Sequence, residues 1–426
     1  MKLQRSAQIE NGSILLAGLI TTAVIGVTIC SYLLLVQSQH AAVLRSQSWN
    51  GALTLAEAGV EEAMAHLNSR LGKMDAPLPD DGWRKLPSGS YSLPLRQVNS
   101  GSYQVLYFPG SAPVIISTGS VSIADSSAVI SRTLQAATRP APMFNAAVAV
   151  LNGIDVRTHA GLTTDSFDSG DPSHSAHGLY SASSATSNGT VASLSGSVSL
   201  NGSVVKGNLL LGPSASYSAN QAGSASGSVS RSLSLDLPDI DIDAITWTPG
   251  VVHGHGPKGG EDGGDQAGYT FKSNGNYEIT TLSGDIFVGA NSFVRLKVTG
   301  SADPGTIHIA SNGTRSGKLE IYMTGSTFTW TGPIEIENGN AKQLAYFGLA
   351  GNSLLDFTHI SSFTGTVFAP HAQLKMGRSH SQRFSFTGSC IGASLTTRGG
   401  CDFHFDQNLP RSGYTLGWTI AQWQEL

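Results

Sequence analysis

One apolar segment near the N-terminus constrains the fold of this chain more than any other feature of the sequence. No Asp, Glu, Lys or Arg occurs between Glu10 and Arg45, and Ile14–Val36 is almost wholly apolar. A helix crosses about 30 Å of hydrocarbon with about 20 apolar residues. The segment is therefore long enough to span a membrane, and it exceeds the ~7 to 15 apolar residues of a cleavable secretory signal. Lys2 and Arg5 precede it and favour a cytoplasmic N-terminus.

A helical pattern continues beyond this apolar segment. Five residues recur at intervals of three and four, which is the period of one helix face: Leu53, Ala56, Val60, Ala63 and Leu67. We therefore expect one helix over residues 13–69, and its length from Ser13 to Leu67 is about 80 Å at 1.5 Å per residue. Its first half is apolar and its second half is amphipathic. A membrane anchor followed by a separate helix is the alternative.

Two short segments carry a family resemblance, one at the start of the apolar run and one in the amphipathic stretch beyond it. They are Gly12-Ser13-Ile14-Leu15-Leu16 and Ala52–Ala63, which reads ALTLAEAGVEEA. This N-terminus resembles that of PilX-type minor pilins, and similar segments occur in the minor pseudopilins of type II secretion. In that family a prepilin peptidase cuts after the glycine that ends a basic leader. The resemblance implies a leader over residues 1–12, cleavage after Gly12 and a mature chain that starts at Ser13.

The resemblance also implies a role and a location. The freed helix of such proteins packs into the core of a pilus or pseudopilus. The fifth mature position, a glutamate in major pilins, is Ala17 here, which fits a minor or tip subunit. The implied partners are the membrane, the prepilin peptidase and other pilin subunits, which would contact the helix face from Leu53 to Leu67. The implied location is the bacterial inner membrane, as a single-pass protein with a cytoplasmic N-terminus and a periplasmic body, or the cell exterior within a pilus.

Residues 70–140 predict a small antiparallel β module. Apolar runs separated by Gly, Pro and Ser predict short strands at residues 91–95, 102–108, 114–118 and 129–136. A helix followed by such a sheet is the pilin-like α+β arrangement that the PilX resemblance implies.

Residues 141–410 lack a helical period and predict a parallel β-helix, or solenoid. Short apolar runs alternate with Gly, Asn and Ser at intervals of about 18 to 25 residues, the range of one solenoid coil. The clearest repeat is FTGTVFA at Phe363–Ala369, which returns 23 residues later as FTGSCIGA at Phe386–Ala393. A mainly β chain of stacked coils needs few charges, and only 13% of the residues are charged. A β-sandwich is the alternative, and residues 411–426 are expected to form a C-terminal tail.

The end of this region resembles uncharacterised β-helical domains of bacterial surface and PilX-like proteins. The resemblance covers Phe363–Leu409, with GGCDFHFD at Gly399–Asp406, and Asp165–Ser169 resembles the start of such domains. It implies a location and an architecture but no reaction.

The charge balance argues against nucleic acid as a main partner. The formal net charge is -4 and the isoelectric point is about 6.3, so the chain lacks the general cationic field that attracts phosphate backbones. The sequence contains no phosphate-binding loop, nucleophile elbow or zinc-protease motif. We therefore expect no cofactor.

Three groups of residues are candidates for chemistry, and each has a simpler interpretation. Asp239, Asp241 and Asp243 alternate with isoleucines, so they line one side of an extended segment whose Ile side is expected to be buried. A glycine-rich loop holds five residues of metal-binding type at no established metal spacing: His253, His255, Glu261, Asp262 and Asp265. His404 lies between two phenylalanines and is expected at the surface rather than as a base. We predict no metal site and no catalytic residue.

The cysteines allow one intramolecular bridge at most. Cys30 lies in the apolar run, whereas Cys390 and Cys401 lie 11 residues apart in the exported part. An oxidising compartment would permit a disulfide between them worth roughly 2 to 4 kcal/mol. Two separately buried thiols are the alternative.

Together these patterns predict a minor pilin-like component of a type IV pilus or a type II secretion-like filament. It would display a β-solenoid for a structural or adhesive role, with a surface glycan or protein as a further partner, and would not be an enzyme. One alternative is a membrane-anchored β-helix enzyme that acts on polysaccharide, which needs carboxylates and a basic residue in one groove. The other is an anchored envelope protein that is never processed as a pilin.

Overall fold

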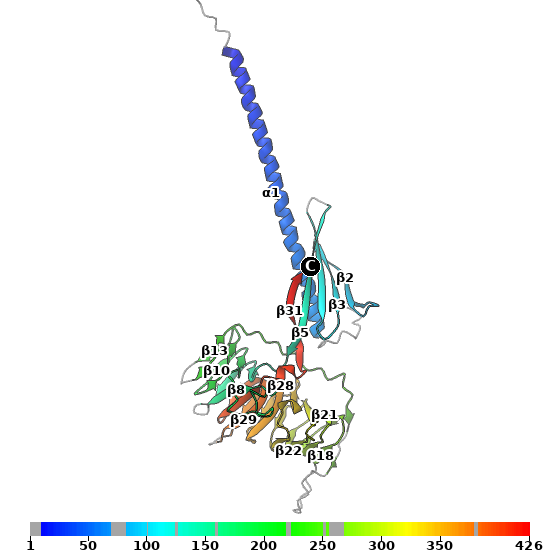
Figure 1. Ribbon diagram of the computed structural model, residues 1–426, viewed down its shortest axis with the longest axis vertical. Coiled ribbons are helices and arrows are strands. Elements are labelled where there is room, and N and C mark those ends of the chain that lie inside the picture. The colour runs from blue at the N-terminus through cyan, green and yellow to red at the C-terminus, as the bar shows by residue number, and fades with distance from the viewer. Residues whose placement is uncertain are drawn as a thin grey trace, which may run out of the picture. The chain divides into compact units, whose positions relative to one another are not determined.

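The fold is mainly β, with one long apolar N-terminal helix and a large sheet that is almost entirely parallel (Figure 1). The computed structural model describes residues 10–69, 82–99, 101–123, 127–157, 161–218, 223–249, 253–254, 268–378 and 382–426. The chain divides into two compact units, Met1–Ala141 with Gly417–Leu426 and Pro142–Leu416. The second unit is thus inserted into the sequence of the first.

The first unit begins with α1 (Glu10–Ser69), which is one unbroken helix (Figure 1). This confirms the single helix that the spacing predicted. In its apolar half, hydroxyl groups donate to carbonyls one turn earlier, as in Thr21 Oγ1 to Ala17 O at 2.8 Å and Thr28 Oγ1 to Ile25 O at 2.8 Å. These bonds satisfy the polar atoms without water, which a membrane-spanning helix requires.

The first unit also contains a six-stranded sheet. Its strands are β1 (Arg84–Lys85), β2 (Tyr91–Val98), β3 (Gly101–Phe108), β4 (Val114–Ser122), β5 (Val129–Pro142) and β31 (Thr415–Glu425), which lie in this order. Strands β1 to β5 pair antiparallel, which confirms the four strands expected between residues 91 and 136. The C-terminal segment, expected as a tail, instead forms the edge strand β31, because Trp418 and Ile420 pack against the core of this unit.

The C-terminal half of α1 packs on β3 and β4 with its predicted apolar face (Figure 1). Ala56, Val60 and Ala63 are fully buried against this sheet and Leu67 is 1% exposed, with Leu53 partly buried beside them. The prediction that this face binds other subunits is therefore wrong. The three-and-four spacing of apolar residues correctly indicates a buried helix face. The surface that covers this face is the sheet of the same chain.

Two glycines explain how closely the helix approaches the sheet. A Cβ atom on Gly119 of β4 would clash with the carbonyl oxygen of Ala52 and lie 2.5 Å from the nitrogen of Ala56. A Cβ atom on Gly59 of α1 would clash with the hydroxyl of Ser117. Helix backbone and strand backbone are therefore in direct contact, which accounts for the small residues of the AEAG segment.

The second unit is built from short strands in two arms. The N-terminal arm comprises β6 (Val148–Val150), β7 (Gly153–Val156), β8 (Leu162–Phe167), β9 (Val191–Ser193), β10 (Ser197–Ser199), β11 (Val204–Val205), β12 (Leu209–Leu211), β13 (Ser216–Ser218), β14 (Ser224–Ala225) and β15 (Val229–Ser230). Strands β6 to β12 each pair in parallel with the strand three positions later, as in β6 with β9, β7 with β10 and β8 with β11. This pairing differs from the antiparallel pairing of a β-sandwich.

The C-terminal arm continues the parallel pairing over a longer stretch. It comprises β16 (Thr248–Pro249), β17 (His253–Gly254), β18 (Gly268–Phe271), β19 (Gly275–Ile279), β20 (Leu282–Val288), β21 (Phe293–Val298), β22 (Ala302–Ile309), β23 (Lys318–Met323), β24 (Thr327–Thr329), β25 (Ile334–Ile336), η1 (Ala341–Gln343), β26 (Leu344–Gly348), β27 (Leu354–Asp356), β28 (Ser362–Met376), β29 (Phe384–Thr397), β30 (Cys401–Asp406) and η2 (Leu409–Arg411). The two copies of the FTG repeat pair in register, Phe363 with Phe386 and Gly365 with Gly388. Their rings stack with centroids 4.9 Å apart inside the core.

The two arms meet where the second unit begins and ends. Strand β29 pairs with β6 and β7, and β30 pairs with β8; we call this junction the seam. From the seam the N-terminal arm extends to β15, and residues 231–247 then connect β15 to β16 at the start of the C-terminal arm. This connector lies along the arms, since Leu233 N donates to Leu211 O, Asp239 contacts His371 and Trp247 packs on Tyr322.

The contact between helix and sheet backbones makes a prediction for stability. Gly119→Val should lower the free energy of opening of β3 and β4 by about 3 kcal/mol, because the added atoms meet backbone that cannot move aside. Hydrogen exchange of the β3 and β4 amides in detergent micelles measures this. The control is Gly110→Val, because a Cβ atom at Gly110 has no neighbour within 4 Å. Equal protection in both variants would contradict the packing described.

Candidate functional site

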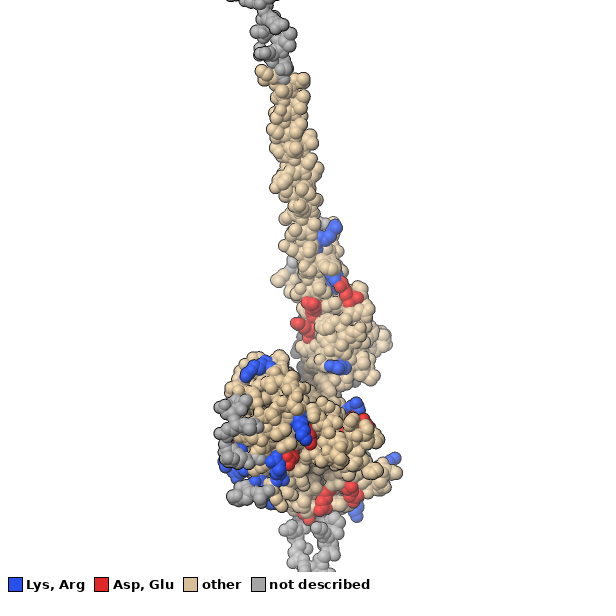
Figure 2. Space-filling view, turned by 60° about the vertical axis from the view of Figure 1, so that its left-hand side comes forward, with Lys and Arg blue, Asp and Glu red and all other residues tan. Residues whose placement is uncertain are grey.

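The N-terminal half of α1 is an apolar surface with no partner in the chain. Its large side chains from Ile14 to Val36 are 42% exposed or more, and in Figure 2 this part of the helix is a tan rod without a charged atom. By length and composition it can cross a membrane. Cys30 is exposed within it, as expected for a small apolar residue facing lipid. Gly12, Ser13 and Ala17 lie within α1, and cleavage after Gly12 stays a prediction.

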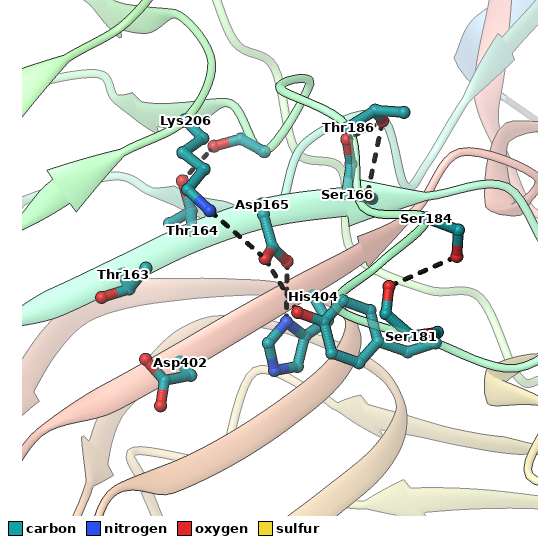
Figure 3. Close-up of polar contacts among 12 residues, drawn as sticks. Thr163, Thr164, Asp165, Ser166, Ser181, Ser184, Thr186, Lys206, Asp402 and His404 are labelled. Atoms are coloured by element: carbon teal, nitrogen blue, oxygen red, sulfur yellow. Dashed lines mark hydrogen bonds and ion pairs between the residues drawn. The ribbon is translucent and has the colours of Figure 1, made fainter. Parts of the chain in front are cut away.

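The second unit contains a polar cluster at the seam that joins Asp165 of β8 to His404 of β30 (Figure 3). The two residues face each other in the β8–β30 register, and His404 Nδ1 lies 2.7 Å from Asp165 Oδ1. Tyr180 donates its hydroxyl to Asp165 Oδ2 at 2.9 Å and stacks on the imidazole with centroids 3.6 Å apart. Lys206 Nζ lies 4.0 Å from the same oxygen.

Burial governs the electrostatics of this cluster. Asp165 is 4% exposed and the His404 side chain is 12% exposed, so the prediction of a surface His404 is wrong. The pKa of Tyr180 is raised, mainly by burial and then by its hydrogen bond to Asp165. The Tyr180 hydroxyl therefore stays a donor at neutral pH. A carboxylate can only accept, so the Nδ1–H of His404 points to Asp165.

A second ion pair lies two residues along the same strands. Arg383 Nε donates to both carboxylate oxygens of Asp402, at 2.9 and 2.8 Å, and its Nη2 donates to Thr163 Oγ1 at 3.1 Å. The hydrogen bonds to Asp402 raise the pKa of Arg383, and partial burial, which would lower it, only partly offsets them. Asp402 thus has a cationic partner, and the pair ties β30 to β8 across the seam.

The cluster has the orientation of a general base but not the remaining parts of a catalytic site. A carboxylate that holds an imidazole by Nδ1 is one half of a catalytic triad. Within the described ranges, no hydroxyl or thiol hydrogen-bonds to His404. The contacts of His404 with Asp165 and Tyr180 instead join segments that belong to different arms. In the fold, the cluster stabilises the pairing of β8 with β30 at the seam.

The aspartate row and the histidine loop give different outcomes. Asp239, Asp241 and Asp243 are exposed, whereas the isoleucines between them pack on the core, which confirms the buried Ile side. Their segment is not a paired strand, and Asp243 lies in a turn. Of the loop residues, His253 lies in β17, and His255, Glu261, Asp262 and Asp265 lie outside the described residues. The described part of the chain holds no group of three His, Cys, Asp or Glu that could bind a metal.

Cys390 and Cys401 are separate buried thiols. Cys401 pairs in register with Phe384, whereas Cys390 lies six residues further along β29 and pairs with Val148. The disulfide that their spacing allowed is not formed, because the ladder places them at different points of β29. Burial raises the pKa of the Cys401 thiol to about 12 and that of Cys390 further, so neither is a reactive thiolate.

A buried carboxylate cluster in the C-terminal arm has no signal in the sequence. Glu320 of β23 is 3% exposed and accepts bonds from Arg295 Nε at 3.0 Å, Tyr322 Oη at 2.8 Å and Tyr414 Oη at 2.6 Å, with Lys318 Nζ at 3.0 Å. Burial alone would raise the pKa of Glu320, but the charge of Lys318 and the hydrogen bonds together lower it. Because Tyr414 lies 94 residues away, only the folded chain brings these groups together.

Comparisons with known proteins give a family match over part of the second unit. A domain of unknown function (DUF7305) matches residues 261–412, less than half of the chain. None of the curated proteins compared with this sequence matches it. The crystal structure of the competence-associated pilin ComZ from Thermus thermophilus is similar over 89% of this chain and 97% of that chain, at 12% identity. The TM-score is 0.23, which is too low to establish a shared fold.

The Glu320 cluster predicts a pH-dependent stability. A lowered folded pKa means that ionised Glu320 stabilises the fold above its unfolded pKa of 4.5, and that this contribution is lost as the pH falls through the folded value. Glu320→Gln should therefore destabilise the second unit by about 3 kcal/mol at pH 7, and the difference should shrink below pH 4.5. Denaturant unfolding at a series of pH values measures it. The control is Glu335→Gln, at an exposed carboxylate that pairs with His308. A difference that does not change with pH would contradict this account.

Proposed function

We propose that the chain is a minor pilin-like subunit of a type IV pilus or a type II secretion-like filament. The observation that carries this proposal is the division of α1 into two halves. The first half is apolar and exposed, and the second half is packed on an antiparallel sheet of the same chain. The first half suits a membrane before assembly and a filament core afterwards, because both offer apolar surroundings.

The second unit is, in this proposal, a displayed β-solenoid with a structural or adhesive role. Parallel pairing of strands that lie close together in the sequence of the C-terminal arm, as in Phe363 with Phe386, supports stacked coils. A surface glycan or protein is the partner expected for such a displayed unit. The net charge of -4 argues against nucleic acid in that role.

We further propose that the second unit is not an enzyme. The rival function is a membrane-anchored enzyme that acts on polysaccharide, which needs a carboxylate free to donate or accept a proton. Asp165 is held by His404 and Tyr180, and Asp402 is held by Arg383. These carboxylates are committed to contacts within the fold, which favours display over catalysis.

The proposed location follows from the helix. Lys2 and Arg5 favour a cytoplasmic N-terminus, so the two units would lie in the periplasm of a bacterial cell or outside it within a filament. The neighbouring subunits must contact surfaces other than the buried face of Ala56 and Val60. Thr54, Glu57 and Glu61 lie on the exposed face of the same helix segment and are available to a neighbour.

Processing of the N-terminus tests this proposal. In cells with prepilin peptidase the mature chain should begin at Ser13, and in cells without it or with Gly12→Ala the chain should keep residues 1–12. N-terminal sequencing or intact-mass measurement of the purified protein distinguishes these products. Gly18→Ala is the matched control, because this helix glycine has no neighbour within 4 Å, and it should be cleaved normally. A chain that keeps residues 1–12 in peptidase-containing cells would overturn the proposal.

A further inference from the structure

The C-terminal strand β31 belongs to the first unit, although it comes last in the sequence. Strand β5 ends at Pro142, and the chain passes through the whole second unit before β31 begins at Thr415. Strands β5 and β31 are nevertheless neighbours in the six-stranded sheet. Closing such a long loop in an unfolded chain has an entropic cost that grows with its length. Pairing of β31 with β5 is therefore disfavoured until something brings the two ends of the second unit together.

Strand β31 fastens the helix and the sheet of the first unit in two places. At one place the Asn68 side chain bonds the edge of β31 in both directions, with Nδ2 donating to Trp418 O at 3.1 Å and Trp418 N donating to Oδ1 at 2.7 Å. Trp418 also packs against the core. This arrangement imitates a strand pairing and joins the C-terminal end of α1 to β31.

The other fastening lies at the end of the chain. Glu425 pairs with Arg132 of β5, whose guanidinium lies over the Trp49 ring of α1 at 3.6 Å. Leu426 N donates to Thr133 O at 3.0 Å. Arg132 is only 7% exposed, and loss of Glu425 would leave a nearly buried cation without its counter-charge, which is costly. We call these two fastenings the clasp.

The seam of the second unit is what brings its two ends together. Met143 N donates to Tyr414 O at 3.0 Å, so the first and last residues of this unit lie side by side. Tyr414 follows β30 by eight residues, and β30 is held on β8 by the seam contacts. Besides the pairs of His404 and Arg383, these include the fully buried Asp406, which accepts from Ser169 N at 3.0 Å and Ser169 Oγ at 2.7 Å.

We propose that the clasp is conditional on the seam. The second unit closes its seam first, and only then does β31 reach the edge of β5 and fasten α1. The first unit is thus complete only in chains whose second unit has folded. Formation of the clasp therefore depends on folding of the second unit. This dependence goes beyond filament assembly and holds whether or not the chain is processed as a pilin.

Refolding of the full chain in detergent micelles tests the order of events. Pulsed hydrogen exchange should protect the amides of β31 at the same time as those of β30 and β8, or later. Protection of β31 before β30 and β8 would overturn the proposal.

Matched variants test the direction of the dependence at equilibrium. Where His404→Ala opens the seam, the amides of β30, β8 and β31 should lose protection together. Where Asn68→Ala opens the clasp, β31 should lose protection while β30 and β8 stay protected, and linkage lowers the stability of the seam only by what the clasp contributed. His308→Ala removes a histidine–carboxylate contact within the C-terminal arm, where His308 Nδ1 lies 3.2 Å from Glu335. This control should not loosen β31.

Two outcomes would overturn the proposal. One is a seam variant in which β30 and β8 lose protection while β31 keeps it, and the other is a clasp variant in which β30 and β8 lose protection along with β31. If His404→Ala does not fold, Arg383→Lys supplies a milder change, because it keeps the charge but loses the bidentate bond to Asp402.

Discussion

The direct contact between the backbones of α1 and β4 is the interaction on which the first unit depends. Ala52 and Ala56 meet Gly119, and Gly59 meets Ser117, so the helix lies closer to the sheet than larger residues would permit. This contact fixes one half of a 60-residue helix and leaves the other half exposed. Because the apolar face is buried inside the chain, the exposed face of this helix segment is the one with Glu57 and Glu61.

The second unit is stabilised differently. Its strands are short and the chain has few charged residues, so its core is built by stacking apolar side chains. Parallel ladders place like residues above one another, as in the stack of Phe363, Phe386 and Phe403, whose neighbouring centroids are 4.9 and 5.3 Å apart. The charged groups that are buried sit where distant segments must be joined. Asp165 and His404 join the two arms, and Glu320 anchors Tyr414 next to the start of the unit.

The sequence predicted the features that depend on local signals. The uncharged apolar run and the three-and-four spacing predicted α1, and the repeat predicted the register of Phe363 with Phe386. It did not predict what covers the helix face, because a period shows that a face is buried but not by what. Strand β31 and the Asp165–His404 pair were missed because each joins segments more than 200 residues apart. Such contacts depend on how distant segments are arranged in the folded chain, and a local sequence pattern does not predict that arrangement.

The central claim is that one continuous helix is lipid-exposed in its first half and sheet-covered in its second. Spin labels at single cysteines along α1, in a Cys30→Ala background in lipid bilayers, test this directly through their accessibility to oxygen and to a nickel chelate. We expect positions 14–36 to be accessible to oxygen but not to nickel. We expect positions 52, 56, 60, 63 and 67 to be shielded from both while 54, 57 and 61 are accessible to nickel. Nickel access along positions 14–36, or uniform accessibility from 52 to 67, would contradict the account.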